Sequence, residues 1–326
     1  MYAACFKNAR IAAFSHKGGF PCLRPPCLSV LVVGGLLCAP AALLTGCFGS
    51  NSKTEDAAAA VSSLLSGHDT IESKIEAISP YLDAANRYNH ILVTFDYAIS
   101  PCLEEMRSGQ HQTHIFLPHF ADLKKDLEEA RANPKSAGVF QDIDAEADTV
   151  LAILKDLAPL ADKMESYYSS KGYLADDYAA AAQMTAQYLP LYDKFEPAYD
   201  KFDAVVTARF KEVRLAQLED MRKEGRTNAA NFLELSIKTR DLADMLDNEN
   251  IDKAAAEAKI TEINELAAKL PDIPALASYK PNLNRFIGSF RSYVAGTEDP
   301  NDVIENFNGV VRSSQNLDLG DLDKKK

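Results

Sequence analysis

The stretch FQDIDAEADTVLAILKDLAPLADKMESYY, residues 140–168, decides the fold of this chain. Its apolar side chains recur at alternating spacings of three and four residues: Phe140, Ile143, Ala147, Val150, Leu154, Leu157, Ala161, Met164 and Tyr168. Four heptads of such a seam are typical of helices that pack in coiled-coil-like bundles. Pro159 lies off the seam and should only kink the helix. The sequence therefore predicts a long helix that packs lengthwise against partners.

A second seam follows, and it is rich in aromatic residues: Tyr178, Ala181, Thr185, Tyr188, Tyr192, Phe195, Tyr199, Phe202 and Val206. Pro190 and Pro197 fall inside it, yet the spacing of the apolar residues keeps its phase through both. This pattern predicts one long kinked helix, or two in line, that continues to Glu224 and ends with Gly225 at the C′ position.

The remaining chain reads as further helices, at about 69–100, 118–132, 228–246, 252–270, 281–296 and 299–316. We expect Ser100-Pro101 to end the first of them, because proline disfavours the helical conformation of the residue before it. The predicted fold is all-α, an elongated helical bundle of about seven to nine helices with coiled-coil-like seams. Residues 68–316 would form the helical domain, and residues 317–326 a polar tail that frays.

The N-terminal 46 residues have the composition of a secretory leader. They carry Lys7, Arg10, Lys17 and Arg24 but no acidic residue, and an apolar run from Leu28 to Leu44 follows. The run ends at Leu44-Thr45-Gly46-Cys47, the pattern of a bacterial lipobox. We therefore predict a lipoprotein signal peptide at 1–46, cleavage between Gly46 and Cys47, and a flexible tether at 47–67. An uncleaved N-terminal anchor is the alternative.

Charge and cysteine usage limit what the mature domain can bind. Loss of the four basic residues of the leader takes the net charge from −12 to −16. Such an acidic domain should bind neither nucleic acid nor an anionic membrane surface through its own residues. Membrane attachment would depend on covalent lipid at Cys47, with two or more acyl chains such as palmitate. Cys102 would be the remaining thiol, and we expect it to be buried and inert.

Several short motifs resemble the YiiG-like family of bacterial lipoproteins. They are the lipobox, Tyr88-Asn89, the segment from Tyr167 to Tyr173, Asp176-Asp177-Tyr178 and Asn306-Phe307-Asn308. The resemblance extends over most of the mature chain. It implies an α-helical envelope lipoprotein of no established activity, and it brings no catalytic or binding residues to this sequence.

Three of the six histidines fall within nine residues, which makes this segment the candidate metal site. His111 and His114 are three residues apart, as are His119 and Asp122, so each pair could share a helical face. Imidazole and carboxylate suit zinc, copper or iron. Pro118 separates the pairs, however, and a solvated loop that enters a helix is the competing interpretation.

The tyrosines between residues 167 and 199 are a second candidate site, because aromatic rings can stack on sugars or peptide side chains. Their heptad spacing favours core packing for most of them. Tyr167, Tyr173 and Tyr178 surround the Lys171-Gly172 turn and could instead form a surface patch, the basis of a glycan-binding hypothesis.

The sequence favours a non-enzymatic, lipid-anchored helical module that faces the periplasm and binds an envelope protein or a cell-wall component. We expect no catalytic residues and no cofactor besides the lipid on Cys47. Phe48 follows the cysteine, and under the enteric sorting rule a residue other than Asp favours the outer membrane. The rival hypothesis is a periplasmic metal-binding protein or metalloenzyme that uses His111, His114, His119 and Asp122.

Overall fold

The computed structural model describes residues 70–247, 250–314 and 317–323, and within these ranges it is helical without a strand. The predicted all-α fold is confirmed. The signal peptide, Cys47 and the tether all lie outside the described residues. In the part of the chain that is described, no helix is both long and apolar enough to cross a membrane.

Four helices make up the N-terminal group: α3 (Ile71–Ser108), α4 (Phe120–Ala132), α5 (Gln141–Ser169) and α7 (Ala179–Lys223). Each of α3 and α5 packs against both α4 and α7. The predicted seam of α5 is buried from Ile143 to Tyr168, and the seam of α7 places Tyr188, Phe195 and Phe202 in the same core. A four-residue helix, α6 (Tyr173–Asp176), turns the chain from α5 into α7.

The second group consists of α8 (Thr227–Ala243), α9 (Lys253–Lys269), α10 (Tyr279–Val294) and α11 (Pro300–Ser314). Short 3-10 helices accompany it at Asp244–Asp247 (η1), Pro274–Leu276 (η2) and Asp321–Asp323 (η3). Its core has Phe232, Phe286 and Phe290 at the centre. Leu218 and Met221, near the end of α7, also belong to this core, so α7 contributes to both groups.

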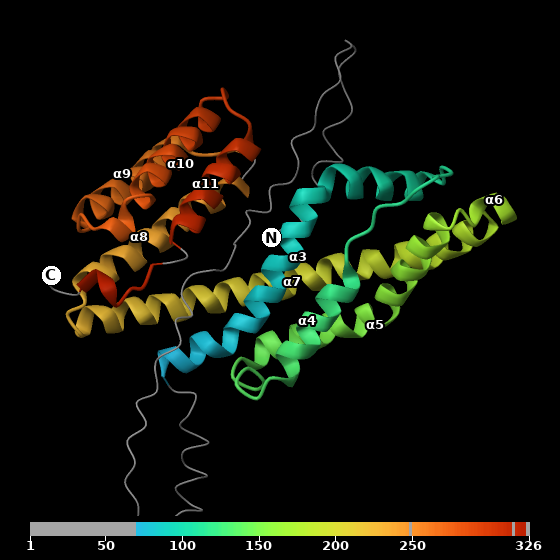
Figure 1. Ribbon diagram of the computed structural model, residues 1–326, viewed down its shortest axis with the longest axis horizontal. Coiled ribbons are helices and arrows are strands. Elements are labelled where there is room, and N and C mark those ends of the chain that lie inside the picture. The colour runs from blue at the N-terminus through green and yellow to red at the C-terminus, as the bar shows by residue number, and fades with distance from the viewer. Residues whose placement is uncertain (1–69, 248–249, 315–316, 324–326) are drawn as a thin grey trace, which may run out of the picture.

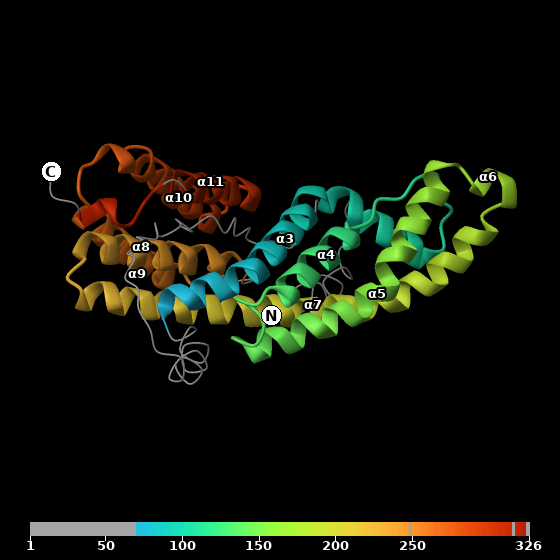
Figure 2. The same cartoon turned by 60° about the horizontal axis from the view of Figure 1, so that its bottom comes forward.

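The molecule is elongated along α7, which has 45 residues and is about 68 Å long at 1.5 Å per residue. Figure 1 shows α6 at one end of the long axis and the α8–α11 group at the other. Figure 2, turned by 60°, shows the same separation. The first described residues of α3 lie toward the end that holds α8–α11, so the α5–α6–α7 turn projects away from the start of the helical body.

The first helix is longer than predicted. It passes through Pro101 and ends at Ser108, where Gly109 with φ 72° forms the C-cap. Proline removes one backbone hydrogen bond, but burial of the following turns offsets that loss. The side chains buried beyond the expected end are Cys102, Leu103 and Met106. Tertiary packing therefore overrides the local stop signal at Ser100-Pro101.

The predicted polar tail does not fray over its described residues. Leu317, Leu319 and Leu322 are buried against the second group. The carboxylate of Asp323 accepts hydrogen bonds from the backbone N–H groups of Asn228 (2.8 Å) and Ala229 (3.1 Å). These contacts correct the expected tail over residues 317–323, because apolar residues at every second or third position anchor it.

Candidate functional site

The segment between α3 and α4, residues 109–119, is fixed to α3 although it is not helical. Gln112 is buried, and its Nε2 donates to the backbone oxygen of Cys102 at 2.9 Å. The Cys102 thiol donates to Gln112 Oε1 at 3.3 Å and accepts from the backbone N–H of Phe116 at 3.4 Å. Burial raises the pKa of the Cys102 thiol, which keeps it protonated. Cys102 therefore serves as a buried anchor for this loop.

The loop separates the three histidines instead of gathering them. The ring of His111 stacks on Tyr178, with ring centroids 4.2 Å apart and planes inclined by 22°. His114 is exposed on another part of the loop. His119 Nδ1 lies 3.6 Å from Asp122 Oδ2 on the exposed first turn of α4. Within the described ranges, no three His, Cys, Asp or Glu side chains are placed to hold a metal ion. The geometry therefore gives the predicted metal site no support.

The tyrosines around α6 form a cluster of contacting rings at the end of the molecule, in which one pair is stacked and the others are tilted or edge-on. Tyr173 and Tyr178 are parallel, with centroids 5.1 Å apart and an interplanar angle of 15°, and Tyr168 follows at 6.1 Å from Tyr173. Tyr173 is only 7% exposed, whereas Tyr167 and Tyr178 are half-buried. A glycan platform needs two exposed coplanar rings. The structure brings the predicted tyrosines together, but as a partly buried cluster.

The tight turn between α5 and α7 contains three non-glycine residues in the left-handed backbone conformation. Lys171, Asp177 and Tyr178 all have positive φ angles, which side chains with a Cβ atom seldom adopt. Gly172 lies so close to Tyr167 that a Cβ atom there would be 2.5 Å from Tyr167 Cδ2. Only glycine fits this position without moving the ring.

A hydrogen bond from a tyrosine hydroxyl to a carboxylate joins the end of α5 to α6 across the turn. The Tyr167 hydroxyl donates to Asp176 Oδ1 at 2.6 Å, and Asp176 Oδ2 accepts from the backbone N–H of Ala180 at 3.1 Å. The hydrogen bond from Tyr167 lowers the pKa of Asp176, while desolvation and that same bond raise the pKa of Tyr167 to about 12. Asp176 thus satisfies a backbone N–H group in the first turn of α7, where a negative charge is also favourable.

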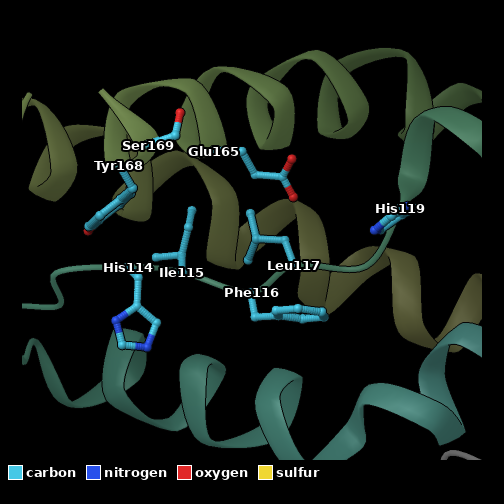
Figure 3. Close-up of a pocket in the computed structure, with 8 residues that line it drawn as sticks. All are labelled: His114, Ile115, Phe116, Leu117, His119, Glu165, Tyr168 and Ser169. Atoms are coloured by element: carbon cyan, nitrogen blue, oxygen red, sulfur yellow. The ribbon is translucent and has the colours of Figure 1, made fainter. Parts of the chain in front are cut away.

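A shallow cavity of about 310 Å³ lies between the loop and the C-terminal half of α5. Figure 3 shows the loop crossing it in extended form, with Ile115 and Leu117 directed toward α5 and with His114 and Phe116 directed to the opposite side. The Glu165 carboxylate points into the space beside Leu117.

Glu165 and Ser169 are the polar side chains that α5 contributes to this cavity. Partial burial raises the pKa of Glu165, and nearby His119 opposes that rise. The Ser169 hydroxyl donates to the backbone oxygen of Ser166 at 3.1 Å, so its proton is engaged in a hydrogen bond within α5. Sequence patterns did not indicate a role in a site for Glu165 or Ser169, because the two residues directly follow the seam residues Met164 and Tyr168.

Comparison with known proteins gives a family and a distant relative. The family model "Protein of unknown function (DUF3829)" matches residues 84–316, which include the loop, the tyrosine cluster and all of the helices from α4 to α11. "Uncharacterized protein YiiG" of Escherichia coli (strain K12) is 24% identical over 151 residues, 45% of this chain and 43% of the relative. The chain thus spans less than half the length of that relative. No solved structure matches.

Proposed function

We propose that this chain, which belongs to the DUF3829 family of proteins of unknown function, is a lipid-anchored helical binding module of the bacterial cell envelope. Its mature part would face the periplasm and carry no catalytic activity. The single observation that carries the proposal is Leu44-Thr45-Gly46-Cys47 at the end of a basic and then apolar leader. An acyl-modified Cys47 would attach an acidic domain to a membrane that its own surface charge cannot bind.

The proposed binding end is the α6 turn. Leu174 on α6 is 75% exposed, beside the ring cluster and the loop that carries His111. Burial of an exposed leucine side chain against a partner is favourable, by about 1.5–3 kcal/mol when the burial is complete. The separation of this end from the start of α3 would leave it accessible while the chain is tethered. The outer membrane is the proposed location, because Phe48 follows Cys47.

Incorporation of labelled palmitate in a bacterial host tests the anchor. Cys47→Ser should abolish labelling and leave the leader uncleaved. The matched control is Cys102→Ser, which removes a buried thiol and should leave both labelling and cleavage unchanged. Equal labelling of Cys47→Ser and the unsubstituted chain would refute the lipid anchor, as would an unlabelled wild-type chain.

Site-specific photo-crosslinking in intact cells tests the binding end. A photoreactive residue at position 174 should give a discrete envelope adduct. Tyr97 on α3 is the control position, because its exposed fraction is also 75% and it lies outside the turn. The same set of adducts from both positions, or none from position 174, would contradict the assignment of the α6 turn.

A further inference from the structure

The cavity of about 310 Å³ between the 109–119 loop and α5 adjoins the proposed binding end. Ile115 and Tyr168 line it, and both also pack in the tyrosine cluster at α6, together with Tyr173 and Tyr178. The cavity and the α6 turn therefore share side chains. A partner that binds at the turn would lie close enough to place one of its own side chains in the cavity.

The inner walls of this cavity are apolar and already in place. Leu117 is 1% exposed and Tyr168 is 7% exposed, while Ile115 is half-buried. Figure 3 shows Ile115 and Leu117 directed from the loop toward α5. Exposed residues complete the lining and leave it open to solvent: His114, His119 and Ser169. Because apolar surface gains by leaving water, these walls suit an aliphatic chain that enters from outside.

Glu165 places a carboxylate at this apolar surface. The carboxylate points into the cavity beside Leu117 (Figure 3), and partial burial raises its pKa. No lysine or arginine of the described ranges forms an ion pair with it. The basic group that acts on Glu165 is His119, which itself lies 3.6 Å from Asp122, and the nearby Asp162 adds a second negative charge. A cation in the cavity would relieve the cost of holding this carboxylate partly out of water.

The chemistry that fits both features is a charged amine at the end of an aliphatic chain. A lysine side chain has a flexible four-carbon stem and a compact ammonium group with three hydrogen-bond donors. Such stems lie along apolar surface while the charged group reaches a polar one. The chain carries a net charge of −12, so its overall field also favours the approach of a cation.

We propose that this cavity binds the side chain of a lysine residue of the protein that contacts the α6 turn. The stem would lie against Ile115, Leu117 and Tyr168, and the ammonium group would donate a charge-assisted hydrogen bond to the Glu165 carboxylate. The proposal rests on the proposed function, because the α6 turn brings the partner to the cavity. It adds the chemical group by which that partner is recognised.

Methyl NMR of the full-length chain, titrated at pH 8.0 with Nα-acetyl-lysine N-methylamide, tests the proposal. This pH lies well above the usual pKa of a carboxylic acid and of an imidazole. The matched probe is Nα-acetyl-norleucine N-methylamide, which keeps the four-carbon stem and lacks the ammonium group. The lysine derivative should bind at least about fivefold more tightly, a difference of ~1 kcal/mol. Methyl signals of Ile115 and Leu117 should shift, and that of Ile143, near the start of α5, should not.

Glu165→Gln should remove most of this preference for the lysine derivative. Asp156→Asn also removes one charge from α5 but lies outside the lining, so it should leave the preference unchanged. Both substitutions fall at exposed positions, where the fold should tolerate them. Equal affinity for the two probes, a preference that survives Glu165→Gln, or shifts that spare Ile115 and Leu117 would each overturn the proposal.

Pentylammonium separates a lysine of a partner from a free amine. Tighter binding of pentylammonium than of the lysine derivative would assign the cavity to a small amine and overturn the assignment to a partner. The titrations use this chain without its partner, so their outcome is independent of photo-crosslinking at position 174. Failure of the lysine site and failure of the α6 turn as a binding end would therefore be told apart.

Discussion

Asp203 is a buried carboxyl between two helices, and its environment sets a pH dependence. Asn89 Nδ2 donates to Asp203 Oδ1 at 3.1 Å, and the Tyr199 hydroxyl donates to Asn89 Oδ1 at 2.7 Å. Burial raises the pKa of Asp203, although the hydrogen bond from Asn89 and the charge of Arg240 oppose the rise. The folded state therefore retains a proton that the unfolded chain has already released, and stability falls as pH rises through this interval.

Asp203→Asn should remove this fall in stability with rising pH. Its amide oxygen can still accept from Asn89, so near pH 7 the free energy of unfolding should increase, because the variant has no buried carboxyl to ionise. Below about pH 3.9, where the unfolded carboxyl is also protonated, the two proteins should be equally stable. Urea unfolding across pH measures this. Asp156→Asn, at an exposed position of α5, should show no such trend. A less stable Asp203→Asn near pH 7 would contradict the account.

Gln112 should control access to the Cys102 thiol. Both side chains are buried, and their two hydrogen bonds hold the loop on α3. Gln112→Ala should loosen the loop and raise the rate of Cys102 modification by a water-soluble thiol reagent by at least about tenfold, since local opening limits that reaction. Gln110→Ala changes an exposed residue of the same loop and should have no effect. Equal rates for the two variants would show that the loop does not guard the thiol.

At the scale of whole elements, the Asp323 cap of α8 gives a direct prediction. The N-cap residue Arg226 supplies no side-chain cap, and Asp323 serves two N–H groups from a distance of almost a hundred residues in sequence. Asp323→Ala should lower the free energy of unfolding by about 1 kcal/mol, as for other helix caps. The exposed Glu305→Ala on α11 is the control in chemical denaturation. An unchanged midpoint for Asp323→Ala would mean that η3 does not support α8.

The two apolar seams predicted α5 and α7 well, because regular spacing of large side chains reflects packing directly. α7 runs from Ala179 to Lys223 through Pro190 and Pro197, within one residue of the predicted range 178–224. The prediction that the first helix ends at Pro101 was wrong, because it gave the local effect of proline more weight than the apolar residues beyond it. Those residues pack in the core and keep the chain helical. The buried tail was missed because residues 317–323 pack on a helix far away in sequence.

In the candidate sites, too, contacts between residues near in sequence were predictable and contacts between distant residues were not. The clustering of Tyr167, Tyr173 and Tyr178 was predictable, since all three lie within twelve residues of chain. Their burial was not, because it depends on Ile115 of the distant loop. The histidines were close in sequence but diverge, since an extended chain directs successive side chains to opposite sides. A cavity between the two helical groups is lined by residues as far apart in sequence as Leu82 and Ser314, and no local pattern could reveal it.

At the scale of the molecule, the buried residues fall into separate cores that share α7. Phe286→Ala should destabilise the α8–α11 group by about 3 to 5 kcal/mol, the usual cost of truncating a buried phenylalanine. Hydrogen exchange should then accelerate in α8–α11 and much less in α3–α5. Phe120→Ala should produce the opposite pattern. Equal loss of protection in both groups for either variant would indicate one cooperative unit.

The mass of the N-terminal peptide of the mature protein, isolated from bacterial membranes, distinguishes a lipid-anchored chain from an unmodified one. The peptide should begin at Cys47 and carry the added mass of two or three acyl chains, with Met1 to Gly46 absent. An unmodified cysteine, or a mature chain that begins at any other residue, would contradict a lipid-anchored binding module.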